Sequence, residues 1–274
     1  MSVIATIARQ ELVVNIRNRW TMIFALVFGI LIVGISYFGT MAEGFSGIEN
    51  FSRTSASILN LILYIVPLAA LIMGTLSFAG DKGSMELLYS QPVSRTQIQI
   101  GKLAGLFASA ALSMLIGFAG AGALIAQASG TDGLIRYSML VGLTLLLSLV
   151  FLVMSMFSAT LCRRTSKAFG VSLFLWFFFV ILYDLLALGI GLALRGRAST
   201  TALFLSLFGN PVDMVRVSGL IILDNVTIFG AAGASLIRFV GGGTAGIVLL
   251  LGSLLAWIVV PVAGTHSILR KQDI

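Results

Sequence analysis

"SMLVGLTLLLSLVFLVMSMFSATL" occupies residues 138–161 and contains no charged side chain. A helix needs about 20 consecutive apolar residues to cross the hydrocarbon core of a bilayer. A helix also satisfies its backbone polar groups internally, which lipid cannot do for it. This stretch therefore predicts a transmembrane helix, and we expect the chain to be an integral membrane protein.

The composition of the whole chain supports the same class. Its 274 residues are 58% hydrophobic and only 10% charged, with a mean hydropathy of +1.08. Soluble domains carry about 25% charged residues, so a soluble protein of this length could not cover its surface. The formal net charge of +7 would suggest a nucleic-acid partner in a soluble chain. Here no nucleic acid is expected, because Lys and Arg near membrane spans set the topology instead.

Six long apolar segments are expected to span the lipid bilayer in a single all-α domain over residues 1–274. The segment around Asp184 contains one acid, and we expect this side chain to reach the outer interface or pair with a base there. The alternative is an acid that lines a pathway or a gate. An even number of spans places both termini on the same side. The predicted spans are 20–40, 57–80, 103–127, 138–161, 168–194 and 244–266.

The distribution of basic residues predicts the orientation. The terminal segments and the connections on their side contain eleven Lys and Arg, whereas the connections on the other side contain six. Because cytoplasmic loops are enriched in Lys and Arg, the N- and C-termini are expected in the cytoplasm. The eleven are Arg9, Arg17, Arg19, Lys82, Arg95, Lys102, Arg163, Arg164, Lys167, Arg270 and Lys271.

Two segments outside the spans have helical character. Residues 2–19 mix apolar and charged side chains, which predicts an amphipathic interfacial helix before the first span. Residues 195–243 form a long outer segment, expected to fold as one or two short helices lying on the membrane or on a partner. Within it, Asn210 before Pro211 predicts a turn.

The chain's own side chains offer little catalytic chemistry. It contains one cysteine, Cys162, and one histidine, His266, which excludes an internal disulfide and a structural zinc site within one chain. Phosphate-loop, metalloprotease and nucleophile-elbow motifs are absent from the sequence. We therefore expect a non-catalytic protein that binds no cofactor and no metal, and whose energy comes from a partner or an ion gradient.

The polar stretch "GDKGSMELLYSQPVSRTQIQIGK", residues 80–102, resembles the signature of ABC-2-type permeases. The resemblance implies a cytoplasmic coupling region at 81–102 that contacts a dimer of ABC ATPases, which would bind the ATP and Mg²⁺. A leucine pair would fill an apolar notch in the ATPase, an acid would pair with one of its bases, and a proline would end the coupling helix. Ser94 would cap the next helix. The implied coupling residues are Lys82, Glu86, Leu87, Leu88, Pro92 and Arg95.

A second stretch, "FGNPVDMVRVSGLIIL" at 208–223, resembles the permeases of transporters that mature nitrous-oxide reductase. That resemblance implies a bacterial inner-membrane homodimer that works with a periplasmic β-helical copper-handling protein, which would hold any copper. Asn210, Pro211, Asp213 and Arg216 carry the match. Asp213 and Arg216 can pair at i, i+3 on a helix. These residues would either dock the periplasmic partner or only stabilise the outer helix.

The resemblance implies that this permease couples cytoplasmic ATP hydrolysis to maturation of a copper site. It would move a sulfur species or copper, or it would transmit motion while nothing crosses. One alternative is an ABC-2 exporter of a lipid-linked, peptide or drug substrate. Another is a stand-alone ion-coupled carrier, which the single acid Asp184 supports poorly. Gly101-x-x-x-Gly105 and Gly242-x-x-x-Gly246 are expected to pack the dimer.

Overall fold

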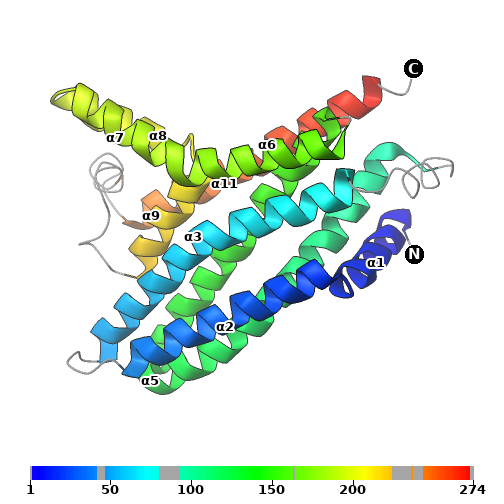
Figure 1. Ribbon diagram of the computed structural model, residues 1–274. Coiled ribbons are helices and arrows are strands. Elements are labelled where there is room, and N and C mark those ends of the chain that lie inside the picture. The colour runs from blue at the N-terminus through cyan, green and yellow to red at the C-terminus, as the bar shows by residue number, and fades with distance from the viewer. Residues whose placement is uncertain are drawn as a thin grey trace.

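The chain folds into an all-helical bundle in the computed structural model (Figure 1). The structure describes residues 2–41, 47–79, 93–162, 164–223, 236 and 243–271, without the side chains of 40–50 and 128–131. Within these ranges every regular element is a helix, as the sequence predicts. The elements are α1 (Val3–Ile16), α2 (Arg19–Met41), α3 (Gly47–Ala79), α5 (Arg95–Leu161), α6 (Thr165–Phe177), the π-helical turn η1 (Phe178–Leu182), α7 (Tyr183–Ala193), α8 (Arg197–Leu207), α9 (Pro211–Ile222) and α11 (Gly243–Lys271).

Among the described residues, six helical segments are long and apolar enough to cross a membrane, which confirms the predicted number. Each observed segment overlaps its predicted span, and most extend further at one or both ends. The helices run on past the apolar windows because nothing in the flanking polar residues breaks them. The observed segments are Arg19–Gly39, Phe51–Ala79, Arg95–Gln127, Asp132–Leu161, Thr165–Ala193 and Gly243–Lys271.

Helix α5 holds the third and fourth spans, which fold back on each other. A straight helix of 67 residues would measure roughly 100 Å. Instead, the Tyr137 hydroxyl donates a hydrogen bond to the Phe118 carbonyl at 3.0 Å, and the two rings meet edge to face. These contacts require a reversal between Gln127 and Asp132, and Figure 1 shows the two halves running in opposite directions.

The hydrophobic core lies between α2, α3 and the two halves of α5, and it continues onto η1, α9 and α11 (Figure 1). Phe28 of α2 packs edge to face on Phe118, and Phe151 of α5 meets Phe179 of η1 in the same way. The fourth span is the most enclosed, with 67% of its apolar window buried, whereas the fifth span has 11%. The fifth span therefore presents most of its surface outward.

Helix α1 and the C-terminal end of α11 lie at the same end of the bundle, on the right in Figure 1. There α1 packs closely on the first turns of α5, where a Cβ at Gly101 would meet Ile7 and one at Gly105 would meet the Ala8 carbonyl. These two glycines thus serve a contact within the chain, rather than the dimer packing expected of them. Gly246 likewise faces Leu236 of the same chain, and Gly242 lies outside the described residues.

The segment expected on the outer side contains two short helices in its described part, as expected, but they do not both lie on a surface. Helices α8 and α9 meet at an angle of 100° and together are apolar enough to count as a broken seventh span. Helix α9 is buried along most of its length and packs against α11, α5 and α3. The expectation of surface helices is wrong for α9, because its apolar side chains pack on other helices of the chain.

Candidate functional site

The first candidate region is the predicted ATPase-coupling region, residues 81–102. The structure describes residues 93–102 of it. Lys82, Glu86, Leu87, Leu88 and Pro92 lie outside the described residues, so their role stays a prediction. Arg95 is described, half-buried, as the first residue of α5.

Residues 94–97 form a capping box at the start of α5. The Ser94 hydroxyl accepts a hydrogen bond from the Gln97 backbone N–H at 3.3 Å, and the Gln97 side-chain oxygen accepts one from the Ser94 N–H at 3.4 Å. The predicted cap is therefore present. A capped start fixes where the helix begins, and so fixes the place at which the polar stretch joins the third span.

Hydrogen bonds between distant helices fasten this end of the bundle. Thr165 at the start of α6 donates to the Ala79 carbonyl at the end of α3, at 2.5 Å. Thr96 and His266 are hydrogen-bonded at 3.1 Å, which joins the start of α5 to the end of α11. Displacement of the segment between α3 and α5 would therefore act on several spans together.

The second candidate region is a polar cluster at the opposite end, where α7 meets α9. Arg216 of α9 donates to Asp184 of α7 at 2.8 Å and to Asp213 of its own helix at 2.6 Å. The predicted i, i+3 pair is present, and Asp184 pairs with a base as expected. The Arg216 guanidinium thus bridges two carboxylates. One belongs to its own helix, and the other lies 32 residues earlier in the sequence.

Asn210 connects the same cluster to the π-helical turn. Its side-chain oxygen accepts from the Val212 N–H at 3.0 Å and so caps α9, with Pro211 in the first turn. Its side-chain nitrogen donates to the Phe179 carbonyl at 2.9 Å and to Asp213 at 3.0 Å. A π-helical turn interrupts the regular helix hydrogen-bond pattern and often occurs at functional positions. Asn210 therefore holds α9 against the irregular turn of the fifth span.

The electrostatics of the cluster centre on Asp213, which lies outside the six spans. The Asp213 carboxylate accepts hydrogen bonds from the Arg216 guanidinium at 2.6 Å and from the Asn210 amide at 3.0 Å, and Arg216 also contacts the Asp184 carboxylate. Asp184 and Asp213 share one base, Arg216. Without Arg216, two neighbouring carboxylates would have no positive charge beside them.

Two aromatic side chains that no sequence motif singles out hold the turn between α8 and α9. The Tyr183 hydroxyl donates to the Ser206 carbonyl at 2.6 Å, and the Trp257 indole donates to the Phe208 carbonyl at 3.1 Å. Their signal was weak, because Tyr and Trp near span ends are common as interfacial anchors. These contacts join the turn to the fifth and sixth spans.

The residues predicted to contact a periplasmic partner are mostly turned inward. Asn210 and Pro211 are buried and the Asp213 side chain is 13% exposed, whereas the Arg216 side chain is 26% exposed. Partner contact stays a prediction, and direct contact would fall chiefly to Arg216.

Comparison with known proteins defines the class of this helical bundle. The model of the family described as "ABC-2 family transporter protein" matches residues 5–274. The chain therefore belongs to the ABC-2 family of transporter proteins, and it is a multi-pass membrane permease.

Two relatives carry the same name, "Probable ABC transporter permease protein NosY". The protein from Pseudomonas aeruginosa is 36% identical over 240 residues, which cover 85% of this chain and 85% of the relative. The protein from Stutzerimonas stutzeri is 31% identical over 291 aligned positions, which cover 99% of each chain.

Proposed function

We propose that this permease couples ATP hydrolysis by a cytoplasmic ABC ATPase dimer to a periplasmic step in copper-site maturation of nitrous-oxide reductase. The similarity to two proteins named NosY supports this choice within the family. The permease acts as a homodimer in the bacterial inner membrane. ATP and Mg²⁺ bind the ATPase, copper is held by a periplasmic β-helical partner, and this chain contributes no cofactor.

Of the two mechanisms, moving a cargo or transmitting motion, the contacts favour motion. The observation that carries this choice is the bridge from Asp184 through Arg216 to Asp213. It ties the fifth span to α9, and Asn210 ties the π-helical turn of that span to the cap of the same helix. A tilt or rotation of the fifth span would therefore carry α9 with it.

The mechanical route begins at the coupling end. The ATPase contacts residues 81–102 and displaces them when it moves. The contacting residues are Lys82, Glu86, Leu87, Leu88, Pro92 and Arg95. The capped start of α5 and the Thr165 and Thr96 contacts pass the displacement to the spans. The periplasmic partner responds to the resulting shift at the far end of the bundle, where the side chains of Asp184 and Arg216 are 32% and 26% exposed.

The test uses sealed inside-out vesicles that contain the permease, its ATPase and the periplasmic partner. We would follow ATP-dependent accumulation of labelled copper and labelled sulfur compounds, together with a fluorescence signal for the partner's conformation. An ATPase-dead complex provides the baseline. Partner movement without accumulation is expected, whereas accumulation of either label would establish a cargo and overturn the motion mechanism.

A pair of variants makes the test specific to the bridge. Asp184→Asn weakens the link between α7 and α9 and keeps the Arg216–Asp213 pair, whereas Asp132→Asn removes an exposed acid elsewhere. Asp184→Asn is expected to keep ATP turnover and lose most partner movement, while Asp132→Asn keeps both. Unchanged partner movement in Asp184→Asn would contradict the proposed route. Full function without the periplasmic partner would favour an exporter instead.

A further inference from the structure

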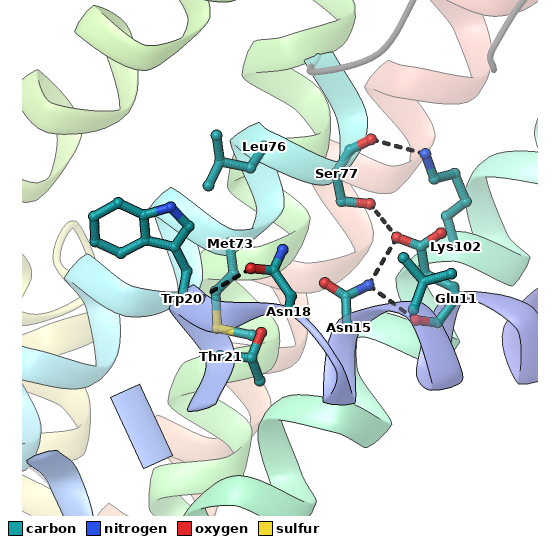
Figure 2. Close-up of a pocket in the computed structure, with 10 residues that line it drawn as sticks. Glu11, Asn15, Asn18, Trp20, Thr21, Met73, Leu76, Ser77 and Lys102 are labelled. Atoms are coloured by element: carbon teal, nitrogen blue, oxygen red, sulfur yellow. Dashed lines mark hydrogen bonds between the residues drawn. The ribbon is translucent and has the colours of Figure 1, made fainter. Parts of the chain in front are cut away.

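A polar cavity lies at the end of the bundle shared by the terminal helices, between α1, α2, α3 and α5 (Figure 2). Its volume is about 220 Å³. A cavity needs only about 10–15 Å³ to hold one water molecule, so this space accommodates a larger polar group. The residues that line it belong neither to the outer cluster of Asp184, Asn210, Asp213 and Arg216 nor to the hydrogen bonds of Thr96 and Thr165 described above.

The cavity wall carries one acid and one base. The Glu11 carboxylate accepts hydrogen bonds from the Asn15 amide at 2.9 Å and the Ser77 hydroxyl at 2.5 Å, both neutral donors. In the described part of the chain no cation lies within ion-pair distance of Glu11. Lys102 is 7% exposed and donates to the Ser77 carbonyl at 2.7 Å. The cavity wall therefore carries one negative and one positive group. The Glu11 carboxylate can accept a hydrogen bond from a positively charged donor.

Thr21 provides an independent observation that points to a ligand in the cavity. Thr21 is 2% exposed and lines the cavity, and its hydroxyl has no hydrogen-bond partner among the residues that the structure describes. Leaving a buried hydroxyl unsatisfied costs free energy. In Figure 2, Thr21, Asn18 and Asn15 lie around the same space. A ligand with several hydrogen-bond donors would satisfy the hydroxyl and the Glu11 carboxylate together.

An apolar track leads away from this cavity along α2. Trp20 lines the cavity and is 63% exposed, and exposed side chains follow it down the helix. Tryptophan at a span end is typical of the membrane interface. In a bilayer the track faces acyl chains, so a head group in the cavity can remain attached to its own tails. The track comprises Met22, Ile23, Leu26, Val27 and Ile30.

We propose that this cavity binds the head group of a zwitterionic phospholipid that carries a primary amine, the phosphatidylethanolamine class. The ammonium donates to Glu11 and Thr21, and the phosphate lies toward Lys102. A primary ammonium offers three N–H donors, whereas a quaternary choline group offers none. The site therefore distinguishes the two zwitterionic head groups by hydrogen bonding, and it binds independently of the copper-maturation role.

The experiment is native mass spectrometry of the purified full-length permease in detergent, with one phospholipid added at increasing concentration. Phosphatidylethanolamine is expected to bind about tenfold more tightly than phosphatidylcholine with the same tails, because charged hydrogen bonds are lost with choline. Glu11→Gln should remove this preference and leave choline-lipid binding unchanged. Thr21→Val, which breaks no existing hydrogen bond, should reduce the preference about threefold.

Two controls are needed. One tests whether any acid of the protein affects lipid preference, and the other tests whether the head group binds without its tails. Asp132→Asn, an exposed acid outside the cavity, should keep the full preference. Soluble phosphoethanolamine should not displace the lipid at equal concentration, since it lacks the tails that lie on α2; displacement would show that a soluble amine is the ligand. Equal binding of the two lipids, tighter binding of phosphatidylglycerol, or a preference that survives in both variants would overturn the proposal.

Discussion

Two polar clusters lie at opposite ends of the bundle, and they differ in how completely their groups are paired. In the outer cluster, Arg216 lies between Asp184 and Asp213, and Asn210 uses both ends of its amide. In the cluster around Glu11, the carboxylate accepts hydrogen bonds only from neutral donors of the described residues, and the nearby Thr21 hydroxyl has no partner among them.

This difference indicates that the first cluster holds two helices together, whereas the second is a binding site. Groups that satisfy one another hold two elements together, and removing one of them leaves the others buried and unpaired. Groups that line a cavity and lack partners are available to a ligand. The outer cluster should therefore be sensitive to mutation, and the Glu11 cluster should respond to lipid. Four substitutions test this contrast.

The largest effect is expected for Arg216→Met. The change keeps much of the side-chain volume and leaves Asp184 and Asp213 without their shared base. Breaking a buried ion pair by removing one partner costs about 3–5 kcal/mol, and partial exposure should hold the loss near the lower figure. Thermal unfolding of the purified permease in detergent measures it. Arg197→Met, at an exposed arginine of α8, should change the midpoint little; equal losses would remove the distinction between joint and surface.

A smaller loss is expected for Asn210→Ala, which removes the cap of α9 and the donor to the Phe179 carbonyl. Loss of a cap costs about 1 kcal/mol, and an unpaired buried carbonyl costs a further ~1 kcal/mol or more. Asn210→Ser should recover the cap alone, since serine also caps helices but is too short to replace the second contact. Unfolding midpoints of the two variants check the order. If serine and alanine behave alike, the contact with the π-helical turn contributes no stability.

These residues also show which features could be predicted from the sequence. Hydropathy and length predict the six spans, because lipid requires long apolar helices whatever their packing. The Asn-Pro pair predicts the turn before α9, but not that Asn210 caps this helix. Apolar composition could not show that α9 is buried, because side chains facing lipid and side chains facing protein are equally apolar. The bridge from Asp184 to Arg216 spans 32 residues and depends on how α7 and α9 pack, which no local pattern encodes.

Glycines illustrate the same limit. A Gly-x-x-x-Gly pattern predicts a close helix contact, and Gly101 and Gly105 do allow one. The pattern does not specify the partner helix, which proved to be α1 of the same chain.

Gly105→Ala tests whether α1 forms the wall of the lipid cavity. The added Cβ would meet the Ala8 carbonyl and Glu11, so α1 has to shift on α5. Overpacking of this kind costs about 1–3 kcal/mol, and we expect a value near the low end because α1 is peripheral. Hydrogen exchange should rise in α1 and stay constant in α9. Gly142→Ala, where a Cβ meets nothing within 4 Å, is the matched control. Protection of α1 that is identical in both variants would contradict the close contact.

The smallest effect is expected for Ser77→Ala. It removes one of the two donors to Glu11, but the carboxylate faces a cavity in which water can replace the lost hydroxyl. The loss of stability should be about 1 kcal/mol or less, clearly below that of Arg216→Met. With phosphatidylethanolamine added, the variant should approach the wild-type unfolding midpoint, because the lipid ammonium supplies donors to the same carboxylate. A loss as large as that of Arg216→Met would show that the Glu11 cluster is a closed joint like the outer one. A small loss that lipid corrects would show instead that this end of the bundle is built to accept a ligand.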